Sequence, residues 1–154
     1  MKTREGEIGM EHTVNETLIY VISLACDVRK GDVPAAILAL LIELGFQTYS
    51  DGFVYLRKAI YARYQNTEIR MSEIYNEVVD SSDASLNANQ VEQAILASIE
   101  SAWKNRDQDK WDYFFSEQRT GKKKKPGNKE FIAQIACFME LWFSHCQEVS
   151  YGIK

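Results

Sequence analysis

Apolar side chains recur at a helical spacing in every segment of this chain that is long enough to judge. Only two prolines, Pro34 and Pro126, interrupt the pattern, and runs that alternate apolar with polar residues, as strands do, are scarce. A chain of 154 residues fits one compact domain with an extension. We therefore predict an all-α fold, built as a compact multi-helix domain with an extra N-terminal helix.

Capping residues and glycines divide the chain into the expected helices. Asp32 should cap a helix that holds Pro34 in its first turn and ends at Gly45, because the missing N–H of proline costs nothing there. The other helices are expected at residues 13–29, 53–64, 67 or 68 to 80, and 88–104. A short aromatic element should follow near 111–115, and a last helix should be capped by Asn128.

The expected helix at residues 13–29 carries an apolar face that needs a partner, so we predict that it packs on the domain or on a second copy. That face consists of Leu18, Ile19, Ile22, Ala25 and Cys26. The inward side chains of the last helix should be Phe131, Ile132, Ile135, Phe138, Met139 and Trp142. Further apolar surface, of the kind that usually serves a partner or a dimer, is expected at Leu96, Trp142, Phe143 and Tyr151.

Neither a membrane span nor a secretory signal is expected. The longest apolar stretch, residues 33–44, contains Glu43 and is far shorter than the roughly 20 residues that cross a bilayer. The first seven residues mix both signs of charge and lack the apolar core and cleavage site of a signal peptide. We expect a cytoplasmic protein.

Motifs of enzymes, metal sites and cofactor sites are missing from the sequence. Cys26, Cys137 and Cys146 have no CxxC or CxxH spacing and are expected to be packed thiols. His12 and His145 stand apart from any recognisable nucleophile motif, and no glycine-rich phosphate loop is present. The chain is therefore not expected to be an enzyme or to bind a metal or a cofactor.

Charge is distributed unevenly along the chain. The net charge of −4 does not suggest a nucleic-acid-binding protein, since such domains usually carry a basic surface. Residues 71–100 contain six acidic side chains and no Lys or Arg, whereas residues 101–130 contain nine basic and five acidic ones. Half of all the basic residues thus lie within thirty positions, where phosphate contacts could be made.

The expected helices at 67 or 68 to 80 and at 88–104 are joined by residues 81–87, which have no helical period and are rich in turn formers. A helix, a polar turn and a second helix form the outline of the helix-turn-helix, a motif that reads DNA. Any two packed helices with a turn would give the same outline. The predicted fold thus contains a candidate helix-turn-helix.

Three separated segments in the same order carry a family resemblance. They are DGFVYLRKAI at residues 51–60, VEQAI with the later IE and AW pairs at residues 91–103, and KPGNKEFIA at residues 125–133. Over about Ile37 to Leu141, the chain resembles the C-terminal DNA-binding domain of the stage 0 sporulation protein A response regulators. The resemblance implies a six-helix domain in which residues 75–104 form the helix-turn-helix and the helix from Ala88 is the recognition helix.

Departures from the family pattern concern the basic residues. The family's recognition helix is arginine-rich, but this chain has Gln90, Gln93 and Leu96 where arginine is expected and Ala97 where histidine is expected. The receiver domain that precedes the module in the family is not expected, because only about 35 residues lie upstream. We therefore divide the chain into an N-terminal extension (1–34), the helix-turn-helix domain (35–145) and a C-terminal tail (146–154).

Two groups of residues are candidates for DNA contact. Gln90 and Gln93 could pair with adenine edges, and the N-terminus of their helix, with Asn87 and Asn89, could approach phosphate. These side chains could equally be solvated polar residues on an exposed face. Phosphate contacts are expected mainly from a basic loop and the helix start that follows it, although a lysine run is often only a solvated loop. The residues are Lys122, Lys123, Lys124, Lys125 and Lys129.

Two functions follow from these observations. The first is a DNA-binding transcriptional regulator of the sporulation-regulator type, with double-stranded DNA as its partner. The second is an interaction module that keeps the fold without binding DNA. It would bind a protein, such as a related regulator, through the acidic helix-turn-helix face. Either protein could also form a homodimer.

Overall fold

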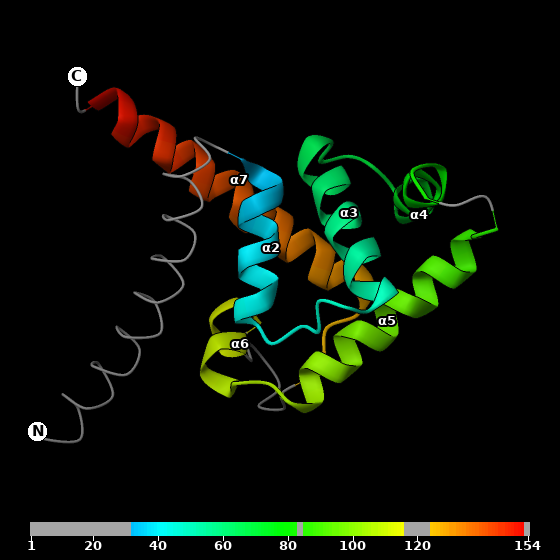
Figure 1. The fold of residues 1–154 in the computed structure, drawn as a ribbon. Coiled ribbons are helices and arrows are strands. Elements are labelled where there is room, and N and C mark those ends of the chain that lie inside the picture. Colours follow the sequence, from blue (N-terminus) through cyan, green and yellow to red (C-terminus); the bar gives the residue numbers. More distant parts are fainter. Residues whose placement is uncertain (1–31, 83–84, 116–123, 153–154) are drawn as a thin grey trace, which may run out of the picture.

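The computed structural model describes residues 32–82, 85–115 and 124–152, with side chains as far as residue 144. Within these ranges the chain forms helices and no strand, which confirms the predicted all-α fold. The helices are α2 (Val33–Glu43), α3 (Asp51–Gln65), α4 (Met71–Asp80), α5 (Ala88–Lys104), α6 (Gln108–Phe114) and α7 (Asn128–Gly152) (Figure 1). The helix expected at residues 13–29 lies outside the described residues. Helix α7 runs beyond residue 145, where the sequence placed the C-terminal tail.

Helix α2 begins and ends as predicted. The side chain of Asp32 accepts a hydrogen bond from the backbone N–H of Ala35 at 3.1 Å, and Pro34 lies in the first turn. After the helix, Gly45 adopts a φ of 90°, a left-handed conformation that favours glycine. The glycine that the sequence placed at the end of this helix therefore ends it in the folded chain as well.

Helix α3 begins two residues before the predicted start. The hydroxyl of Ser50 accepts from the backbone N–H of Phe53 at 3.2 Å and caps the helix, so Asp51 and Gly52 are already helical. The predicted start near residue 53 was therefore wrong by two residues, because Ser50 caps the helix and Asp51 and Gly52 form its first turn.

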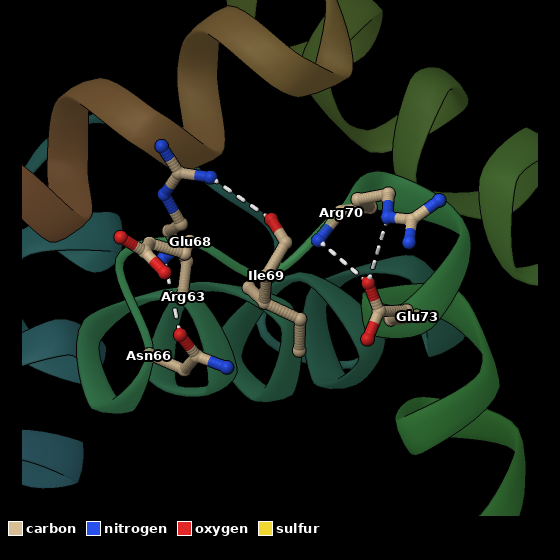
Figure 2. A network of polar contacts seen from close by, with 6 residues as sticks. All are labelled: Arg63, Asn66, Glu68, Ile69, Arg70 and Glu73. Atoms are coloured by element: carbon tan, nitrogen blue, oxygen red, sulfur yellow. Dashed lines mark hydrogen bonds and ion pairs between the residues drawn. The ribbon is translucent and has the colours of Figure 1, made fainter.

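Helix α4 begins at Met71, later than the predicted start at residue 67 or 68 (Figure 2). The side-chain oxygen of Asn66 accepts from the backbone N–H of Glu68 at 3.1 Å, and Arg63 donates to the carbonyl oxygen of Ile69 at 3.1 Å. These bonds hold a turn in place of a first helical turn. In the same network, the backbone N–H of Arg70 donates to the Glu73 carboxylate at 3.3 Å, and the Arg70 side chain pairs with that carboxylate.

The core gathers around α3, which contacts α2, α4, α5 and α7. Where α6 meets the core, Trp111 is almost wholly buried, and its indole N–H donates to the carbonyl oxygen of Leu44 at 3.0 Å. Aromatic rings surround this indole at centroid distances of 5.6 to 6.0 Å; they belong to Phe46, Trp103, Phe115 and Phe131. The aromatic element predicted near 111–115 is therefore part of the main core.

Helix α7 buries most of the predicted face, with two differences. Phe131, Ile132, Ile135 and Met139 are buried, whereas Phe138 and Trp142 are only partly so. Phe143, which was expected to add to the exposed apolar surface, is 5% exposed, because it lies on the core side of α7. Leu141 is 67% exposed instead. Leu96 is partly buried, and the side chain of Tyr151 lies outside the described residues.

Among the described helices, none is both long enough and apolar enough to span a bilayer. The apolar helix α2 contains 11 residues, and the longer α7 interrupts its apolar side chains with polar ones.

Candidate nucleic-acid interface

Helices α4 and α5 pack against each other through short apolar faces (Figure 1). Helix α4 buries Ile74, Tyr75 and Val78, and α5 buries Val91, Ile95, Ile99 and Ala102. Residues 81–87 connect the two helices, with residues 83 and 84 outside the described ranges. Two contacting helices joined by a short connection are the arrangement that the sequence predicted for the helix-turn-helix.

The end of α4 is held by Lys58 of α3. The Lys58 ammonium donates to the carbonyl oxygen of Ser81 at 3.1 Å and to the hydroxyl of Ser82 at 3.3 Å. The hydroxyl of Ser82 in turn donates to the carbonyl oxygen of Val78 at 2.7 Å. No pattern in the sequence predicts this contact, although Lys58 lies in the segment at 51–60 that carries the family resemblance.

Helix α5 approaches α3 closely at Gly52. A Cβ atom placed on Gly52 would lie 2.2 Å from the carbonyl oxygen of Ala94 and 2.2 Å from the hydroxyl oxygen of Ser98. Only a glycine leaves room for the α5 backbone at this point. This contact therefore fixes how far α5 stands from the centre of the domain.

The first turn of α5 is closed by a reciprocal pair of hydrogen bonds. The backbone N–H of Gln90 donates to the Asn87 side-chain oxygen at 2.9 Å, and the backbone N–H of Asn87 donates to the Gln90 side-chain oxygen at 2.9 Å. This capping box uses the oxygen atoms of two side chains that the sequence proposed for DNA contact. Their amide nitrogens are the groups left to contact another molecule.

The outward side of α5 forms one stripe. Five exposed side chains recur every three or four residues and therefore lie on one face of the helix: Asn89, Gln93, Ala97, Glu100 and Lys104. The stripe starts with two carboxamides and carries an acidic and a basic group further along. We call it the α5 stripe.

The predicted lysine contacts differ in their surroundings. Lys125 forms an ion pair with Glu100 of the α5 stripe, with its ammonium nitrogen 2.7 Å from the carboxylate oxygen. The hydrogen bond from Lys125, and then its positive charge, lower the pKa of the Glu100 carboxyl below its ordinary value. Lys124 and Lys129 are exposed, while Lys122 and Lys123 lie outside the described residues.

The start of α7 is tied to both helices of the candidate motif by Asn128. Its side-chain nitrogen donates to the hydroxyl of Tyr75 at 3.2 Å and to the carbonyl oxygen of Glu92 at 3.0 Å. Burial raises the pKa of the Tyr75 hydroxyl. The prediction of Asn128 as the helix cap was wrong, because Asn128 is itself helical and the helix N–H of Phe131 donates to the carbonyl oxygen of Gly127.

Exposed charge around α4 and α5 is mainly negative. Beyond the α5 stripe, carboxylates are exposed at Glu73, Glu77, Asp80 and Glu92. Arg106, just after α5, stacks its guanidinium 3.6 Å from the centre of the Trp103 ring and donates to the Trp103 carbonyl oxygen at 2.8 Å. Within the described ranges, no group of three or more His, Cys, Asp or Glu residues could hold a metal ion.

A family model described as the sporulation initiation factor Spo0A C terminal matches residues 37–139. The match runs from α2 into α7 and includes Gly52, Lys58, Asn128 and the whole of α4 and α5. It spans two thirds of the chain and confirms the resemblance that the sequence segments indicated. This protein therefore belongs to the Spo0A C-terminal domain family.

Proposed function

We propose that this protein is a DNA-binding transcriptional regulator in which α5 enters the major groove of duplex DNA. Family membership supports this function. The observation that carries it here is the position of Asn89 and Gln93, two exposed carboxamides at the start of the α5 stripe. A carboxamide can donate to N7 of adenine and accept from its N6 amino group, so these residues suit an adenine edge.

Phosphate contacts would come from the start of α7 and from the loop before it. Lys124 and Lys129 are exposed, and Asn128 connects this region to α4 and α5. Lys122 and Lys123 belong to the same basic run. Each phosphate that a lysine neutralises contributes about −0.9 to the slope of log affinity against log salt.

The test is a fluorescence-anisotropy titration of the full chain with labelled duplexes over a range of salt concentrations, after selection of preferred sequences from a random pool. Gln93→Ala should change the preferred sequence. Lys124→Ala and Lys129→Ala should weaken binding to all sequences alike and flatten the salt slope. Lys110→Ala is the matched control, because Lys110 pairs with Glu43, the last residue of α2. Absence of salt-dependent binding to any duplex at low ionic strength would overturn the proposal.

One observation favours a second function, an interaction module without DNA binding. The exposed carboxylates of α4 and α5 give this face a negative charge, and residues 71–103 contain no Lys or Arg. Such a face repels phosphate and suits a basic protein surface. The arginine-rich recognition helix of a related regulator is a partner of that kind. Calorimetric titration with that regulator's DNA-binding domain should then give a complex that its operator DNA displaces.

A further inference from the structure

Helix α2 is apolar on every side. Of its eleven residues only Glu43 is charged. Its inner face packs on α3 and α7 and is buried, as Val33, Ala36, Ile37, Leu40 and Leu41 show. A helix that is apolar all round is normally covered all round, because exposed apolar area is costly in water.

The outer face of α2 is not covered to the same degree. Ile42 is 50% exposed, and Ala35, Leu38 and Ala39 are partly exposed. These residues follow the spacing i, i+3, i+4 and i+7, so they form one continuous apolar stripe. We call it the outer α2 face.

A segment of the same chain has the matching pattern. Residues 13–29 lie outside the described residues, and two residues separate their end from the cap of α2 at Asp32. Their apolar positions, which include Ile19, Ile22 and Cys26, recur at the same helical spacing as those of the outer α2 face. Only Lys30 and Gly31 separate this segment from Asp32 in the sequence, and two antiparallel helices are commonly joined by about two to five residues.

We propose that residues 13–29 form a helix that lies antiparallel on the outer α2 face. A turn centred on residues 30 and 31 pairs Cys26 with Ala35, Ile22 with Ala39, and Ile19 with Ile42. Small residues then meet next to the tight turn and large ones meet further away. The helix would be about 25 Å long, at about 1.5 Å per residue, and would cover the whole of α2.

The same chain is a better occupant than a second copy. A short connection holds the segment near α2 at an effective concentration in the millimolar range. A second copy would have to compete with this tethered segment for the outer α2 face. The proposal does not depend on DNA binding, so its test can fail or succeed independently of the proposed function.

Disulfide trapping tests the position of the segment directly. In full-length protein carrying Cys137→Ser and Cys146→Ser, the native Cys26 and an introduced Ala35→Cys should form a disulfide within one chain. Peptide mass mapping and non-reducing electrophoresis would identify it. Tyr49→Cys in the same background is the control, since Tyr49 is 82% exposed in a loop and should remain unlinked to Cys26. Disulfides between chains only, or none, would overturn the proposal.

Thermal unfolding provides a second, independent measurement. If the segment covers Ile42, Ile42→Asp in the full chain should lower Tm by about 5 °C or more, because a carboxylate would be buried in an apolar contact. Tyr49→Asp should leave Tm nearly unchanged. Equal and small effects of the two substitutions would show that the outer α2 face is open to water.

Discussion

The ammonium nitrogen of Lys125 lies 2.7 Å from a carboxylate oxygen of Glu100, which links the basic run to the outward stripe of α5. Both groups are partly exposed, with 31% and 48% of their side-chain surfaces accessible, so solvent screens the pair and its contribution to stability is small. Its importance is for binding, because a lysine engaged by a carboxylate is less available to a phosphate.

Glu100→Gln should therefore strengthen duplex binding. The substitution removes one negative charge from the α5 stripe and releases Lys125, so the salt slope should become steeper by at most about 0.9. Anisotropy titrations at several salt concentrations measure both effects. Glu140→Gln, the same charge change at an exposed position of α7, is the control. Identical salt slopes for the two variants would contradict the prediction.

The pKa of Glu100 should respond to its lysine partner. In the folded protein this pKa is lowered, so the ion pair is fully formed above the ordinary glutamate value of about 4.3 and is lost as pH falls through the lowered value. Carboxyl ¹³C shifts measured during an acid titration follow the group directly. Lys125→Ala should raise the pKa towards the ordinary value, whereas Lys129→Ala should not. A pKa unaffected by Lys125→Ala would disprove the pairing in solution.

Gly52→Ala should destabilise the domain. The added methyl group would lie 2.2 Å from the backbone oxygen of Ala94, so α3 and α5 would have to separate. We expect a loss of about 1–3 kcal/mol or more, measured by chemical or thermal unfolding. Gly127→Ala is the matched control, because no atom lies within 4 Å of the added methyl group there. Similar losses for the two variants would show that close packing is not the cause.

Asn87 and Gln90 should affect stability, whereas Gln93 should not. Asn87→Ala removes the side-chain cap of α5 and should cost about 0.5–2 kcal/mol. Gln90→Ala should cost less, since it removes only the return bond of the capping box. Gln93→Ala alters an exposed side chain of the α5 stripe and should leave the free energy of unfolding nearly unchanged. Urea unfolding of the three variants separates these effects, and a large loss for Gln93→Ala would contradict them.

Asn128 and Tyr75 should be energetically coupled. Asn128→Ala removes hydrogen bonds to the Tyr75 hydroxyl and to the Glu92 carbonyl oxygen and should cost about 1–3 kcal/mol. Tyr75→Phe removes only the first bond and should cost less. A double-mutant cycle by thermal unfolding should give a coupling energy of about 0.5 kcal/mol or more. Strictly additive losses would mean that the bond to Tyr75 contributes nothing.

Local sequence determined the helices whose ends carry their own signals. Helix α5 runs from Ala88 to Lys104 as predicted, because Asn87 is a capping residue and the apolar spacing persists to Trp103. Helix α2 likewise follows from Asp32, Pro34 and Gly45. The buried faces were predictable for the same reason, since a period of 3.6 residues assigns each side chain to one side of a helix.

Tertiary structure decided the roles that depend on distant partners. Asn128 looked like a helix cap, but Tyr75, 53 positions away, and Glu92 take its side-chain nitrogen. Lys125 was predicted to contact phosphate, but folding places Glu100 beside it. No pattern in the sequence predicted that Lys58 would hold the end of α4. A polar side chain bonds to whatever partner packing brings within reach, and its neighbours in sequence do not contain that information.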